Sequence, residues 1–302
     1  MGYDRTPMSA DLLLVVANVV YATSYAATRL VLDDIPPAIL ALLRLVIGSA
    51  ILIPVAVASR RPGAPPISRR DRWSIVWMGV LGFAGAFAFS HWGIARSTAT
   101  NAALLITVEP ISLMLLSPWL LGERLTRREA AGAGLALIGA ALVVVNGVPG
   151  VSLSLVPHWR GDLLLLLAGL AYASYSLFGR DVLARHSSLA VTAWSIGWGA
   201  VAMLPLAALE LVAGAPIRLT TQSVAGALYL AVIITALGYL VWNYCLERVS
   251  APRAAIFLNI QPLVGALVGV YYLGEVLTIF TVVGGALILA GLSLTLKGQG
   301  TG

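Results

Sequence analysis

Three ionisable side chains interrupt long apolar stretches of this sequence, namely Arg44, His91 and Glu109. A guanidinium binds a carboxylate through paired hydrogen bonds, and a carboxylate binds an ammonium group in a similar charge-assisted way. Arg44 and Glu109 together could therefore hold a zwitterion. Charged groups are costly to bury in apolar surroundings, so we treat each of these residues as a candidate site residue.

The positions of Arg44 and Glu109 along their apolar stretches allow the two side chains to meet. With a rise of about 1.5 Å per helical residue, they lie within roughly 5 Å of the same depth. The sequence leaves three interpretations open: a structural Arg–Glu pair, a dipolar binding site, or an Arg44 side chain that reaches towards the nearer surface. His91 lies about one turn from the end of its stretch, which suits an interfacial position as well as a binding one.

Aromatic and amide side chains recur in other apolar stretches at helical spacing. Tyr172 and Tyr175 share one helix face, as do Tyr239, Trp242 and Asn243. Such residues can stack on a ligand, although the same spacing also serves core packing. The candidate substrate-binding residues are Arg44, Glu109, Tyr21, Tyr172, Tyr175, Tyr239, Trp242, Asn243, Gln261 and His91.

The elements that must position these residues are membrane-spanning helices. Of 302 residues, 59% are hydrophobic and 11% are charged, and the mean hydropathy is +0.92. A soluble chain carries about 25% charged residues, so soluble, disordered and disulfide-scaffold classes are excluded. The composition predicts an all-α polytopic membrane protein. Since a crossing needs about 20 apolar residues, we predict ten helices, over 10–32, 36–58, 73–95, 98–120, 126–146, 161–184, 188–212, 222–246, 250–272 and 277–296.

The net charge of +6 arises from basic residues that are spread between the apolar stretches. No basic cluster suggests nucleic acid as a partner. If the N-terminus is cytoplasmic, 14 basic residues fall in inside segments and four in outside ones, with Arg44 within a helix. Because cytoplasmic loops of membrane proteins are enriched in Lys and Arg, both termini are predicted to face the cytoplasm.

An internal repeat divides the chain into halves over 10–146 and 161–297. DLLLVVANVVYATSYAATR at 11–29 matches DLLLLLAGLAYASYSLFGR at 162–180, with an offset of 151. At an offset of 152, Pro110 matches Pro262, and Leu-Gly-Glu-x-Leu-Thr at 121–126 matches 273–278. Each half contains five predicted helices, an odd number, so the second half must be inverted in the membrane. Inverted repeats are an architecture of secondary transporters.

The repeat separates shared positions from positions that differ between the halves. Arg44 corresponds to Ser195, His91 to Asn243, and Glu109 to Gln261, so the polar candidates break the symmetry. Pro110 and Pro262 are shared, and each frees a backbone carbonyl one turn earlier, near Ile106 and Leu258. We predict hinges or cavity-lining bends at these prolines, although plain kinks would account for them equally well.

The two Leu-Gly-Glu-x-Leu-Thr motifs are predicted to have a structural role at helix starts. Glu123 and Glu275 can complement the positive N-terminus of the helix that follows, and Thr126 and Thr278 can cap it.

The late proline followed by Leu-Gly-Glu-x-Leu-Thr in each half resembles the EamA-type transporters of the drug/metabolite transporter superfamily. The resemblance covers about 11–297. It implies ten helices as two inverted five-helix repeats and the movement of small metabolites, often outward. Within that superfamily, the chain is most similar to bacterial amino-acid exporters, including those for aromatic amino acids.

We therefore predict a secondary transporter that exports small metabolites by alternating access, with neutral or aromatic amino acids as substrates. A multidrug or lipophilic-cation exporter and a nucleotide-sugar transporter remain alternatives, although a diphosphate would need more buried cations than Arg44. An intramembrane enzyme is disfavoured, because no HExxH or GxSxG motif occurs. We expect no cofactor or metal, a monomer in the bacterial inner membrane, and the bilayer and a small-molecule substrate as partners.

Overall fold

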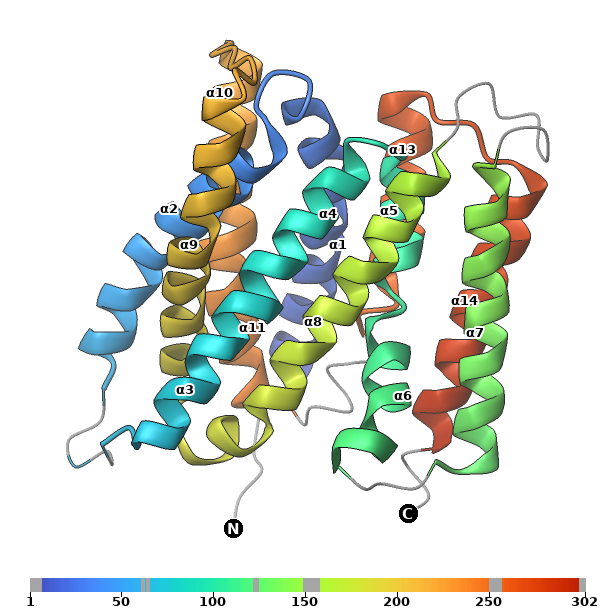
Figure 1. Cartoon of the computed structure of the whole chain (residues 1–302). Coiled ribbons are helices and arrows are strands. Elements are labelled where there is room, and N and C mark those ends of the chain that lie inside the picture. Colours follow the sequence, from blue (N-terminus) through green and yellow to red (C-terminus); the bar gives the residue numbers. More distant parts are fainter. Residues whose placement is uncertain are drawn as a thin grey trace.

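A computed structural model describes residues 7–60, 63, 66–121, 125–148, 158–249 and 257–298 (Figure 1). This part of the chain contains eight helices that are long and apolar enough to cross a membrane and two shorter apolar helices, Ile260–Leu273 and Ile279–Thr295. The prediction of an all-α polytopic protein with ten helical spans in two repeats is confirmed. Glu123, of the first Leu-Gly-Glu motif, lies outside the described residues.

Several of the ten spans are built from more than one helical element. The first half contains α1 (Pro7–Val31), α2 (Pro37–Ala58), α3 (Arg69–Trp77), η1 (Met78–Gly85), α4 (Ala86–Ile94), α5 (Ala99–Ile106), α6 (Glu109–Leu121) and α7 (Arg127–Asn146). The second half contains α8 (Trp159–Arg185), α9 (Ser188–Val212), α10 (Thr221–Leu228), η2 (Tyr229–Leu237), α11 (Gly238–Leu246), α13 (Ile260–Leu273) and α14 (Ile279–Gly298).

Two π-helical segments, η1 and η2, lie at matching positions of the two halves. Their first residues, Met78 and Tyr229, are related by the repeat offset of 151. The sequence predicts one continuous helix over 73–95 and another over 222–246, so these interruptions are new. In η1, glycines meet neighbouring helices closely: a Cβ on Gly82 would lie 2.7 Å from the Cβ of Tyr175 in α8. π-helical turns inside α-helices often mark functional sites.

The fourth predicted span is broken just before Pro110. Thr107 and Val108 separate α5 from α6, and the Val108 N–H donates to the Leu105 carbonyl at 3.1 Å, a tighter turn than an α-helix. The Thr107 hydroxyl donates to the Ala103 carbonyl at 2.6 Å. The interruption follows from the missing N–H of proline, whose bonding partner would have been the Ile106 carbonyl. At the matching place before Pro262, a turn at Leu258 and Asn259 precedes α13.

Glycines bring the last helices of the two halves together. A Cβ on Gly132 of α7 would lie 2.7 Å from the carbonyl oxygen of Gly291, and one on Gly139 would lie 2.5 Å from that of Gly284 in α14. The repeat offset pairs Gly132 with Gly284 and Gly139 with Gly291. The contacts are therefore related by a pseudo-twofold axis between α7 and α14. Small residues at such crossings allow the close backbone approach that holds helices together in lipid.

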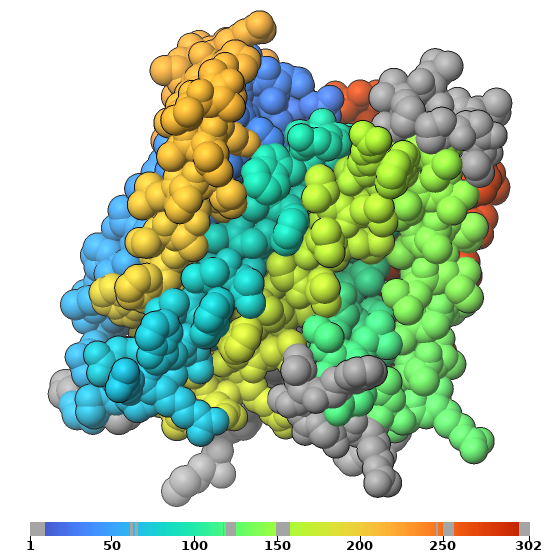
Figure 2. Space-filling model, viewed as in Figure 1, coloured from blue at the N-terminus to red at the C-terminus, as the bar shows by residue number. Residues whose placement is uncertain are grey.

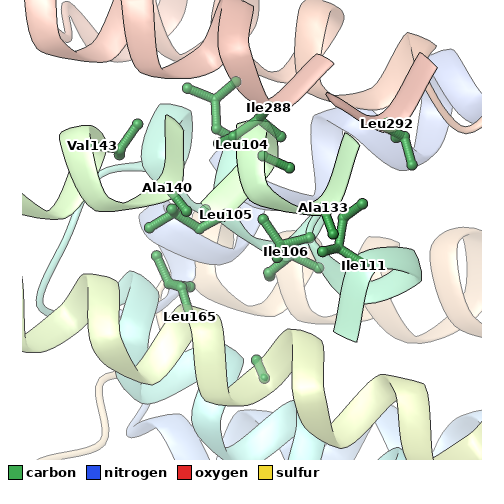
Figure 3. Packing of buried hydrophobic residues seen from close by; sticks show 14 of the residues in the cluster. Leu104, Leu105, Ile106, Ile111, Ala133, Ala140, Val143, Leu165, Ile288 and Leu292 are labelled. Atoms are coloured by element: carbon green, nitrogen blue, oxygen red, sulfur yellow. The ribbon is translucent and has the colours of Figure 1, made fainter. Parts of the chain in front are cut away.

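The largest apolar cluster joins the halves as well. Leu105, Ile111, Val143, Leu165 and Ile288 are almost fully buried and come from α5, α6, α7, α8 and α14 (Figure 3). On the face seen in Figure 2, α4 of the first half and α8 of the second lie side by side. The two halves therefore share one apolar core and pack directly against each other.

Glu275 acts on a different helix from the one predicted. Its carboxylate accepts the backbone N–H groups of Ala99 at 2.6 Å and Thr100 at 2.8 Å, at the start of α5 rather than at its own following helix. Gly274 permits this by ending α13 in the left-handed region, with φ of +66°. Thr126 caps α7 as predicted, in a capping box with Glu129.

Candidate substrate-binding site

Arg44 lies in the middle of the protein on α2 and is only 8% exposed. Its Nη1 lies 3.0 Å from His91 Nε2, and its Nε donates to the Thr235 hydroxyl at 3.4 Å. The guanidinium carbon stands 4.5 Å from the centre of the Phe87 ring. No described carboxylate forms an ion pair with Arg44. The cation is therefore held by neutral groups, which is unusual for a buried charge.

Aromatic rings from both halves form a cluster that begins at Phe87, the ring beneath this arginine. Phe87 of α4 contacts His91 and Tyr172 edge to face, with ring centres 5.6 and 6.3 Å apart. Phe83 of η1 contacts Tyr175 and Tyr239 in the same way, at 5.3 and 5.5 Å. The rings form one continuous aromatic cluster across the two halves, next to a cation that has no counter-ion among the described residues.

Glu109 is the first residue of α6, directly after the break in the fourth span. Its carboxylate forms no hydrogen bond or ion pair with any described residue. Tyr25, Tyr172 and Tyr239 lie close enough to both Arg44 and Glu109 to interact electrostatically with each of them. The structural Arg–Glu pair is not formed. Arg44 also does not reach towards the surface, because its head group is bonded inside the protein.

His91 lies in the last turn of α4, about one turn from the end of its span as predicted. Its side chain is nevertheless only 1% exposed, and its Nε2 lies against Arg44. Tyr175 is placed in the aromatic cluster, where its hydroxyl lies 2.8 Å from that of Thr192.

Gln261 and Trp242 contact helices other than α2, which carries Arg44. Gln261 ties α13 to α1: it donates to Asn18 at 2.8 Å and lies 3.4 Å from the Tyr25 hydroxyl. Trp242 packs on the cluster around Leu14.

The remaining two candidates, Asn243 and Tyr21, both make contacts at α11. Asn243 donates to the carbonyl of Tyr239. Tyr21 lies against α11, where a Cβ on Gly238 would come 2.7 Å from its hydroxyl.

A cavity of about 2030 Å³ opens at the end of the protein where α2 ends and α9 begins. Among the sequence candidates, only Asn243 lines it, together with residues such as Trp194 and Trp198 of α9. The cavity approaches the central residues from this end without including Arg44. Among the described residues, no group of three His, Cys, Asp or Glu side chains could hold a metal ion.

Sequence reasoning missed three residues of this region. Thr235 bonds Arg44, and Phe83 and Phe87 supply the rings around it. One signal was available, because the offset of 152 pairs Thr235 with Phe83. In the structure each faces a glycine of the opposite half: a Cβ on Gly48 would lie 2.8 Å from Thr235, and one on Gly199 would lie 2.9 Å from Phe83.

Both halves of the chain match the same known family. The EamA-like transporter family matches residues 8–145 and 159–297. The chain belongs to the EamA-like transporter family. Arg44 and the aromatic cluster are therefore part of a membrane transporter.

Curated relatives span nearly the whole chain. The "Probable terminal-alkyne amino-acid exporter" of Streptantibioticus cattleyicolor is 33% identical over 285 residues, covering 93% of this chain and 91% of that protein. The "Probable amino-acid metabolite efflux pump" of Salmonella typhimurium is 28% identical, covering 95% and 93%. A solved crystal structure with 21% identity matches with a TM-score of 0.62 over 96% of this chain and 98% of its own. This last likeness concerns the fold alone.

Proposed function

We propose that this EamA-family transporter exports small zwitterions, best of all neutral and aromatic amino acids, by alternating access. The observation that carries the proposal is the buried Arg44, which has no carboxylate partner in the described part of the chain. A substrate carboxylate would supply the missing negative charge and would be recognised through charge-assisted hydrogen bonds. Glu109 would bind the ammonium group, and the tyrosines near the two charges would contact the side chain.

The pseudo-twofold arrangement supports alternating access. Two structurally similar halves can open a central site to either side at similar energy, as inverted-repeat transporters do. The two relatives named for amino-acid export support the substrate class. We further propose that a monomer is the working unit, because all of the central residues belong to one chain.

Counterflow in proteoliposomes tests the substrate class. We expect purified protein to exchange radiolabelled phenylalanine against internal phenylalanine or leucine, and to exchange glutamate much more slowly, because a second carboxylate would lie in the aromatic cluster. Stacking against one ring adds about 0.5–1.5 kcal/mol beyond area burial, so phenylalanine should exceed leucine. Equal exchange of amines and amino acids would instead support a lipophilic-cation exporter.

The orientation is also proposed, from the bias of 14 basic residues against four. Both termini and the 59–72 loop would be cytoplasmic, in the inner membrane of a bacterium. In Figure 1 the start of α3 and the end of α7 lie at opposite ends of the protein.

In cells that express a variant without Cys245, a membrane-impermeant maleimide should miss a cysteine at Arg69. The same reagent should label a cysteine at Gly150 or Ser152. The reverse pattern would overturn the orientation.

A further inference from the structure

At the end of the protein opposite the cavity, one carboxylate connects the two halves. Glu210, near the end of α9, accepts the backbone N–H groups of Ala38 at 2.8 Å and Ile39 at 3.2 Å, both in the first turn of α2. Its other oxygen accepts the indole N–H of Trp92, in α4, at 2.9 Å. A negative charge at a helix N-terminus is favourable, and three donors satisfy the carboxylate. Glu210 therefore joins the second half to two helices of the first.

The internal repeat identifies the residues at the cavity end that correspond to Glu210 and its partners. An offset of 151 relates Glu210 to Ser59, and Ala38 and Ile39 to Leu189 and Ala190 in the first turn of α9. An offset of 152 relates Trp92 to Tyr244. All four counterparts line the cavity of about 2030 Å³. Glu210 thus bridges the two halves at one end, whereas the corresponding residues at the other end line a cavity.

The two ends differ in chemistry as well as in shape. A serine hydroxyl is short and uncharged, so Ser59 cannot span the cavity to the N–H groups of Leu189 and Ala190. The N-cap residue of α9, Ser187, makes no side-chain capping bond, which leaves that helix start free of a carboxylate partner among the described residues. Two halves related by symmetry would otherwise give the two open states similar energies.

We propose that Glu210 is a latch that holds the Trp92 end closed, and that its replacement by Ser59 in the other half biases the transporter towards the state open at the end of the cavity. The proposal rests on the alternating access proposed above. With the orientation proposed above, the open end is cytoplasmic. The latch therefore sets the resting transporter to load from inside, which suits export.

Spin labels at two pairs of exposed positions measure the distance between the two halves at each end of the protein. Asp33, in the turn before α2, and Val212 of α9 report the distance between the two helices at the latched end. Arg60, just after α2, and Ser187, just before α9, report it at the cavity end. Distance distributions are measured by pulsed electron resonance in proteoliposomes, on a background that lacks Cys245 and without added substrate. We expect the wild type to show mainly short distances for the first pair and long distances for the second.

Glu210→Ala should raise the population with a long first distance and a short second distance at least about tenfold, because charge-assisted hydrogen bonds are lost. Ser59→Glu should shift both distributions in the same direction by creating a latch on the start of α9. This position is exposed, so the variant does not depend on a change in the core. Glu210→Gln should shift them less, and Glu247→Gln, which removes an exposed carboxylate at the cavity end, should leave both unchanged.

Saturating phenylalanine separates failure of the latch from failure of the proposed function. Phenylalanine should redistribute the wild-type distances between the same two populations. If it does so while Glu210→Ala and Ser59→Glu leave the distances unchanged, the latch is wrong and alternating access stands. If neither phenylalanine nor either variant moves any distance, alternating access is overturned together with the latch. A purely structural cap would lower stability in Glu210→Ala without any change at the cavity end.

Discussion

Arg44→Ala is expected to abolish amino-acid counterflow and to leave the protein folded. Removing a charged group from a buried charge pair with a ligand costs about 2–5 kcal/mol, which corresponds to at least about 30-fold weaker binding. The folded protein loses only a hydrogen bond to Thr235, a contact to His91 and the stacking on Phe87. Because Arg44 has no counter-ion in the described structure, removing it also removes the cost of an uncompensated buried charge.

Two measurements separate binding from folding in this variant. The midpoint of thermal unfolding in detergent should stay within a few degrees of the wild type or rise, since the protein loses an uncompensated charge. Counterflow of an amine without a carboxylate, such as phenethylamine, should survive if the wild type transports it at all. Arg29→Ala, which removes a partly exposed arginine paired with Asp33 at 2.8 Å, is the matched control and should transport normally. Undiminished phenylalanine exchange by Arg44→Ala would refute the dipolar site.

Glu109→Gln is expected to lower phenylalanine counterflow at least about tenfold, because a hydrogen bond to a charged group contributes about 1.5–3 kcal/mol. The substitution keeps the shape of the side chain and places in the first half the residue that the second half already has at Gln261. Transport is measured in proteoliposomes at equal protein content. 3-Phenylpropionate, which lacks the ammonium group, should be affected much less than phenylalanine.

Stability again discriminates between roles for Glu109. A carboxylate that compensated Arg44 in a buried pair would cost about 3–5 kcal/mol when neutralised. No such pair is formed in the described structure, so Glu109→Gln should remain stable in detergent with an unchanged elution profile and unfolding midpoint. Loss of folded protein in Glu109→Gln, with Glu247→Gln unaffected, would return the structural pair to consideration. Together with Arg44→Ala, this variant tests each end of the zwitterion separately.

The class of protein and its architecture could be predicted from the sequence. Apolar stretches of about 20 residues can be satisfied only as helices in a bilayer, because every backbone N–H and C=O must be paired within the segment. The repeated Asp11 and Asp162 segments and the paired Leu-Gly-Glu motifs then divided the ten predicted helices into halves of five, and an odd number per half requires inversion. These conclusions depend on composition and periodicity, which are local properties of the chain.

The sequence also identified residues that break the symmetry, although not how they are arranged. It named Arg44, Glu109 and His91, yet left open whether the two charges pair. It also grouped Trp242 with the central tyrosines, whereas Trp242 packs on the cluster around Leu14. Sequence spacing fixes which residues share a helix face. It does not fix which neighbouring helix that face meets.

Tertiary structure alone decided the contacts between helices that are distant in sequence. Arg44 is held by His91 of α4 and Thr235 of η2, and the latter is 191 residues away. Glu210 and Glu275 each act on the N-terminus of a helix in the other half, although a local reading assigned Glu275 to its own next helix. Likewise, no local sequence pattern predicts the cavity at the end opposite Glu210. The physical reason is that hydrogen bonding of side chains and the closure of one end depend on how the two halves pack, which the apolar pattern of either half leaves undetermined.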